Sequence, residues 1–186
     1  GNVGRHYYEW RYGAVPSEQQ PPVVDFMDDL QDRLAPLVNG WAGQNAVAVT
    51  DLQTGKTISV NGDRQQLAAC VVKIFIMMAV AQDLEAGRYA EDEVIDLIYG
   101  AMGPSNTWEA RELIRYAGGG DMAAGMRRVN DIMQSLGMSR SVLDHPAGYP
   151  EEEYGYGFED NALTANDMNL ALTKLYKRQA GLSEWA

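Results

Sequence analysis

Several features are scarce in this chain of 186 residues, which contains one cysteine, two histidines and no long hydrophobic run. A single cysteine excludes a disulfide within the chain. His6 and His145 have no cysteine at ligand spacing, so we expect no zinc site and no metal or other cofactor. The longest apolar run covers residues 74–81 and is too short to cross a bilayer, so we expect no membrane insertion.

Positive charge is also scarce, because 15 lysines and arginines stand against 26 acidic residues and the net charge is -11. This balance argues against binding to nucleic acid or to an anionic membrane surface. Residues 54–57 (TGKT) have the composition of a phosphate-binding loop, but Thr50 stands where that motif requires its first glycine. We therefore interpret this segment as a hairpin turn.

The spacing of apolar residues predicts an α+β protein that is mostly helical, with one clear β-hairpin. Residues 1–21 show no period and are interpreted as an N-terminal arm or linker, whereas residues 22–186 are expected to form one domain. A long loop is expected at 137–163. The expected strands are 46–49 and 57–60, and the expected helices are 23–38, 70–84, 94–102, 108–116, 122–136 and 164–177.

The only cysteine stands three residues before a lysine, in the segment 70–73 (CVVK) at the start of an expected helix. Residues three apart on a helix share one face, so Lys73 can take or steer the proton of a nucleophile at Cys70. The positive end of the helix and the nearby ammonium would favour a thiolate. In the alternative interpretation, Cys70 is a small buried residue in a decayed site, and Lys73 has only a structural partner, such as an acid or Asn106.

A set of short segments in a fixed order accompanies this pair, and together they resemble the class A serine β-lactamase and penicillin-binding-protein superfamily over about residues 23–178. The resemblance implies a helical domain packed on an antiparallel sheet, of which only the N-terminal hairpin is evident. It also implies a β-lactam or a peptidoglycan peptide as ligand and an extracytoplasmic location, although residues 1–3 do not begin a signal peptide. The segments are 48–51 (AVTD), 54–56 (TGK), 68–73 (AACVVK), 104–107 (PSNT), 118–121 (GGGD), 136–138 (LGM) and 163–168 (LTANDM).

The resemblance also implies roles for particular residues. Cys70 takes the position of the nucleophilic serine, and Lys73 takes the proton-handling position. The S-D-N motif of the family aligns with residues 104–106, so Asn106 is retained to orient substrate and Pro104 replaces the relay serine. Ser105 would supply a relay hydroxyl only if the loop shifts. Glu152 is the candidate for the carboxylate that activates the deacylating water, and the alternative is a solvated acidic loop.

The family's K-T-G strand, which supplies the second oxyanion donor, is expected to be absent, because the sequence stops at Ala186. Loss of one such donor typically costs about 10²–10³ in rate. With the other departures, this predicts a catalytically inactive or strongly altered homologue that binds a ligand or partner through the ancestral cleft. The alternative is an acyl-transfer hydrolase of β-lactams or peptidoglycan-type amides, with Cys70 as nucleophile and Lys73 as base. In a third possibility, a partner chain supplies the missing strands.

Overall fold

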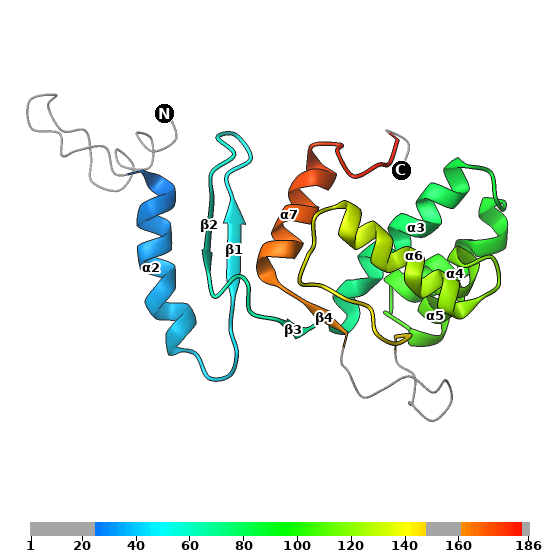
Figure 1. Cartoon of the computed structure of the whole chain (residues 1–186), viewed down its shortest axis with the longest axis horizontal. Coiled ribbons are helices and arrows are strands. Elements are labelled where there is room, and N and C mark those ends of the chain that lie inside the picture. Colours follow the sequence, from blue (N-terminus) through cyan, green and yellow to red (C-terminus); the bar gives the residue numbers. More distant parts are fainter. Residues whose placement is uncertain (1–24, 148–160, 184–186) are drawn as a thin grey trace, which may run out of the picture. The chain divides into compact units, whose positions relative to one another are not determined.

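The computed structural model describes residues 25–147 and 161–183, which form an α+β fold (Figure 1). The chain divides into two compact units, Gly1–Gly62 and Asp63–Ala186, each held together by its own internal contacts. The assignment of residues 22–186 to one domain therefore stays a prediction. The arm expected at residues 1–21 and the candidate Glu152 both lie outside the described residues.

The first unit contains helix α2 (Phe26–Gly40) and the hairpin of strands β1 (Val47–Thr50) and β2 (Thr57–Val60). The strands are antiparallel and α2 packs against β2. The helix and both strands were predicted, with ends that differ by up to three residues. The buried side chains of this unit come from both layers, and they are Met27, Val38, Ile58 and Val60.

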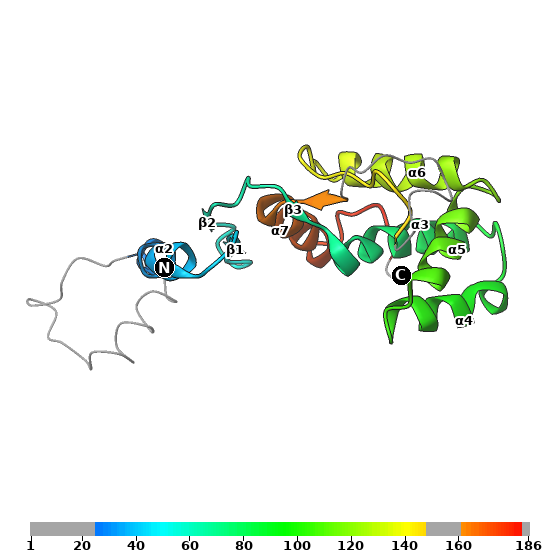
Figure 2. The ribbon, with the colours of Figure 1, turned by 90° about the horizontal axis from the view of Figure 1, so that it is seen from below.

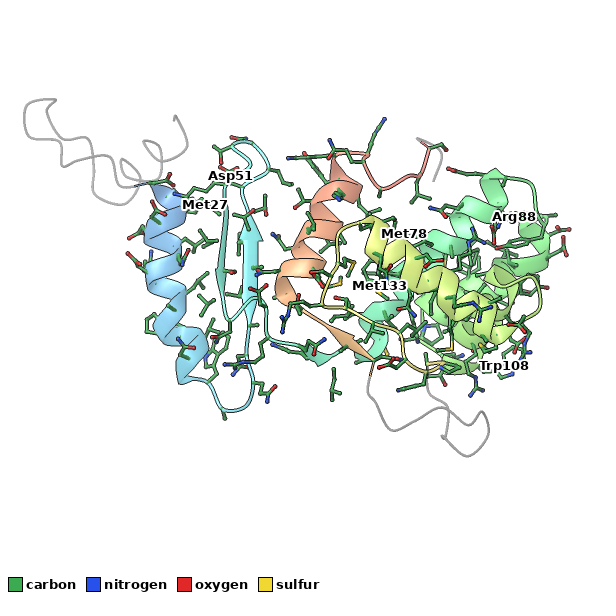
Figure 3. The ribbon with its side chains drawn as sticks, viewed as in Figure 1. Met27, Asp51, Met78, Arg88, Trp108 and Met133 are labelled. Carbon is green, nitrogen blue, oxygen red and sulfur yellow. The ribbon has the colours of Figure 1, made fainter. Side chains whose placement is uncertain are left out.

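The turn between β1 and β2 is closed by its own side chains. Asp51, labelled in Figure 3, accepts hydrogen bonds from the Gln53 amide at 2.9 Å and from the Thr54 hydroxyl at 2.7 Å. Gly55 has φ +76°, a left-handed conformation that glycine adopts without strain. The interpretation of this segment as a hairpin turn is therefore confirmed, with Thr57 as the first residue of β2.

The second unit is built around helix α3 (Lys73–Glu85), which contacts both α5 and α6 (Figure 2). Its side chains are apolar around most of its circumference, as expected for a central helix, and Met78 of α3 and Met133 of α6 are both buried (Figure 3). The remaining helices are α4 (Glu91–Met102), α5 (Thr107–Ala117), α6 (Met122–Ser135) and α7 (Ala165–Tyr176). All four were predicted within three residues of their ends.

Two details of this unit differ from the sequence-based prediction. Cys70 does not begin an α-helix, because residues Ala69–Val72 form a 3-10 turn and α3 begins at Lys73. The expected long loop at 137–163 contains the short strand β4 (Ala162–Leu163), which pairs antiparallel with β3 (Gln66–Leu67). Two-residue strands are too short to show an alternating pattern, so this second sheet could not be predicted.

A glycine of α6 lies directly against the backbone of α5. A Cβ atom at Gly125 of α6 would lie 1.8 Å from the carbonyl oxygen of Ile114 in α5. Backbone atoms cannot give way as a flexible side chain does, so the two helices would have to separate. Only glycine fits at this position.

We expect Gly125→Ala to lower the free energy of unfolding by about 1–3 kcal/mol, the usual cost of overpacking. Urea denaturation followed by circular dichroism measures this change. Gly40→Ala is the matched control, because a Cβ at Gly40 has nothing within 4 Å. Equal stability of the two variants would contradict the close approach of α5 and α6.

A buried carboxylate joins α3 to α6 and to the turn after α3. Asp83 is 1% exposed and accepts from Arg128 at 2.5 Å and from Arg88, labelled in Figure 3, at 2.6 Å. Arg128 also donates to the carbonyl oxygens of Ala79 and Ala117. Burial, and then the charge of Asp83, raise the pKa of the nearby Tyr89 hydroxyl above its ordinary range.

Replacement of Asp83 by Asn should destabilise the protein by about 3–5 kcal/mol, because it leaves the guanidinium of Arg128 without its countercharge. The side chain of Arg88 is 59% exposed, so Arg88→Gln should cost less than about 1 kcal/mol and is the control. Thermal unfolding of both variants distinguishes these outcomes. A small effect of Asp83→Asn would show that Arg128 reaches solvent without cost.

Candidate active site

A pocket of 290 Å³ lies in the second unit, where β3, the 3-10 turn and the first residues of α3 and α5 meet residues 145–147 and Asn161. It contains the only thiol of the chain and a buried amine in one place. Its lining residues are Leu67, Ala69, Cys70, Lys73, Thr107, His145, Ala147 and Asn161.

Cys70 is exposed, on the 3-10 turn that leads into α3. The preceding residue, Ala69, has φ +44°, which is unfavourable for a residue with a Cβ. Such conformations cost of order 1–3 kcal/mol and are often found at functional sites. Because Cys70 is exposed, the alternative expectation that it is buried is wrong, whereas the expectation of a decayed site stays a prediction.

Lys73 is the first residue of α3 and is 3% exposed. Its Nζ donates to the carbonyl oxygen of Ser105 at 2.5 Å, to the Ser105 hydroxyl at 2.8 Å and to the carbonyl oxygen of Asn106 at 3.2 Å. An ammonium group has three protons to donate, so the three acceptors match the charged form. Ser105 has φ +63°, and in this conformation both its carbonyl and its hydroxyl oxygen contact Lys73.

The turn before α5 carries two further predicted site residues, Ser105 and Asn106, and their side chains have different partners. The side-chain amide of Asn106 donates to Glu109 at 3.1 Å and does not line the pocket, whereas Thr107 does. The structure therefore brings Cys70 and Lys73 together in one pocket and places the Ser105 hydroxyl on Lys73. It does not bring the Asn106 side chain into the pocket.

Sequence reasoning missed two polar residues of the pocket, His145 and Asn161. His145 was considered only as a zinc ligand, and it lies 75 positions after Cys70. Asn161 follows the acidic part of a segment without any period. No local signal marks either residue, because only the pairing of β3 with β4 brings their segments beside the 3-10 turn.

The described part of the chain contains no group of three metal-ligating side chains. Among the helices in residues 25–147 and 161–183, none is both long enough and apolar enough to span a membrane.

A family model described as the β-lactamase enzyme family matches residues 29–185, and the chain belongs to this family. This agrees with the resemblance seen in the ordered sequence segments. No curated protein matches the chain.

Solved structures with the same fold include both β-lactamases and a carboxypeptidase. A β-lactamase from Sphaerobacter thermophilus DSM 20745 is 24% identical, with a TM-score of 0.63, and the match covers 84% of this chain. An ancestral class A β-lactamase (GNCA) is 22% identical over 84% of this chain, with a TM-score of 0.64. The D-alanyl-D-alanine carboxypeptidase DacD from Francisella tularensis is 23% identical over 73% of this chain, with a TM-score of 0.56.

These likenesses establish the fold as that of β-lactamases and penicillin-binding proteins. The matches cover 64%, 66% and 37% of the length of the three solved chains, in the same order. The activity, substrate and partners of this chain are therefore matters for proposal.

The contacts of Lys73 predict a structural effect of its removal. Lys73→Met should lower the free energy of unfolding by about 1–3 kcal/mol, because the carbonyl oxygens of Ser105 and Asn106 lose their donor. Lys177→Met is the control, since Lys177 is exposed and such changes usually stay within about 0.5 kcal/mol. Chemical denaturation measures both, and an unchanged Lys73→Met variant would contradict this role.

Proposed function

We propose that the protein is a strongly altered acyl-transfer member of its family, in which Cys70 accepts an acyl group from a β-lactam or a peptidoglycan-type amide. The observation that carries the proposal is the 2.8 Å contact between the Ser105 hydroxyl and Lys73, which shares a pocket with the exposed Cys70. It places a hydroxyl on the ammonium group that lines the same pocket as an accessible thiol.

The relay role is assigned to Ser105 rather than to position 104. With Ser105 as the relay serine, Thr107 takes the position of the substrate-orienting asparagine, and it lines the pocket. Asn106 then falls at the middle position of the motif. In this alignment the S-D-N motif corresponds to residues 105–107, so the loop need not shift. The serine of the motif is then retained as Ser105 and is not lost at Pro104.

In the proposed reaction the sulfur of Cys70 attacks the carbonyl carbon of the amide. A thioester bond forms, the C–N bond breaks, and the thiol proton passes to the leaving nitrogen through the Ser105 hydroxyl. Lys73, with all three protons donated, holds Ser105 and supplies positive charge beside this path. A β-lactam opened in this way stays attached in full, because its leaving nitrogen belongs to the same molecule.

A second candidate function is non-covalent binding of the same class of ligand. Two of the three acceptors of Lys73 are backbone carbonyls, which suits an ammonium whose role is only to hold a turn. The pocket of 290 Å³ would then bind a ligand without acyl transfer. A partner chain that adds strands, a catalytic Glu152 and an extracytoplasmic location all stay predictions from the family resemblance.

Intact-mass spectrometry after incubation with benzylpenicillin tests the proposal. We expect a gain of one complete ligand mass at Cys70, no gain in Cys70→Ala, and acylation slowed by about 10²-fold or more in Ser105→Ala. Ser139→Ala is the matched control for the loss of a hydroxyl, since Ser139 is exposed and its hydroxyl, unlike that of Ser105, is not an acceptor of Lys73. Thermal stabilisation by the ligand without any mass gain would overturn acyl transfer in favour of binding alone.

A further inference from the structure

We propose that His145 is the general base that activates water for hydrolysis of the acyl-thioester at Cys70, an inference that rests on the proposed acyl transfer. His145 is half-buried and lines the same pocket as Cys70 and Lys73. The amine of Lys73 is occupied by Ser105 and Asn106. Among the described residues that line the pocket, the imidazole is therefore the side chain best able to take a proton from water.

A hydrogen bond of the His145 imidazole decides which of its two nitrogens can accept a proton from water. Nδ1 of His145 lies 2.9 Å from the carbonyl oxygen of Pro146. A carbonyl oxygen only accepts, so Nδ1 must carry the proton and donate it. In the neutral ring the lone pair is then on Nε2, the nitrogen that a base would use.

The backbone on either side of the ring is held by one buried amide. Asn161 Oδ1 accepts from the amides of Asp144 at 2.7 Å and His145 at 3.0 Å. Its Nδ2 donates to the carbonyl oxygen of His145 at 3.0 Å. Because Asn161 is 8% exposed, these bonds form away from bulk water and fix the start of the imidazole side chain.

The same residue holds the other wall of the pocket. The carbonyl oxygen of Asn161 accepts from the Ala68 amide at 2.7 Å, two residues before Cys70. One residue therefore positions both the segment of the proposed base and the turn of the nucleophile. We assign Asn161 as a positioning residue.

The hydrolytic step balances with groups that are present. The oxygen of a water molecule attacks the thioester carbonyl carbon, and Nε2 of His145 takes one proton from that water. The C–O bond forms and the C–S bond breaks. The proton on the imidazole then passes to the departing sulfur, which restores the thiol of Cys70 and releases a carboxylic acid.

The test compares formation and loss of the benzylpenicillin adduct in separate steps. His145→Asn retains an amide that can donate to the Pro146 carbonyl and lacks Nε2. We expect it to acylate at a rate close to that of the unmodified protein and to lose the adduct about 10²–10⁴ times more slowly, measured by intact mass after removal of free ligand. His6→Asn, at the other histidine of the chain, is the matched control and should lose the adduct at the unmodified rate.

Chemical rescue distinguishes a base from a structural role. In His145→Ala, imidazole added to the buffer should restore loss of the adduct, which a purely structural defect would not allow. Asn161→Asp keeps an acceptor for the two amides and lacks the donor to the His145 carbonyl, and it should slow loss of the adduct by a smaller factor than His145→Asn. Circular dichroism confirms that each variant is folded.

Each outcome separates the two proposals. Equal loss of the adduct from the unmodified protein and His145→Asn overturns the role of His145 and leaves acyl transfer intact. A permanent adduct on the unmodified protein has the same consequence, because there is then no hydrolysis to activate. If no adduct forms in the unmodified protein, the proposed function fails and the role of His145 fails with it.

Discussion

The buried ammonium of Lys73 is the constraint on which the pocket depends. A charged group that is 3% exposed must have hydrogen-bond partners, and here all of them come from the turn before α5. The first residue of α3 and the first turn of α5 are thereby held at a set distance. The left-handed backbone of Ser105 follows from the same contacts, since both oxygens of that residue accept from one amine.

Each end of α3 carries a buried charged group with specific partners, and the two charges have opposite sign. Lys73 at the start requires carbonyl acceptors, and Asp83 near the end requires the guanidinium groups of Arg128 and Arg88. Hydrophobic burial is non-directional and leaves the rotation and axial position of a helix adjustable. Buried polar groups with specific partners remove that freedom, so α3 and the 3-10 turn that carries Cys70 have a defined position relative to α5 and α6.

The opposite wall of the pocket depends on an uncharged residue. Asn161 bonds with its side chain to the segment of His145 and with its backbone to Ala68. These bonds tie the end of the segment that precedes β4 to the turn that carries Cys70. A thiol and an imidazole then line one pocket, and the Ser105 hydroxyl contacts the ammonium that lines it, although these groups come from separate parts of the sequence.

The sequence by itself determined the helices, the β-hairpin and the family, because apolar periodicity and turn chemistry act over a few residues and the family motifs keep their order. It also placed Cys70 and Lys73 together, since their spacing is local. Only the tertiary structure decided that the Ser105 hydroxyl contacts Lys73 and that His145 shares the pocket. It also decided that the Asn106 side chain bonds to Glu109. The physical reason is that these contacts depend on a left-handed residue and on the pairing of two-residue strands distant in sequence, and neither leaves a periodic pattern in the chain.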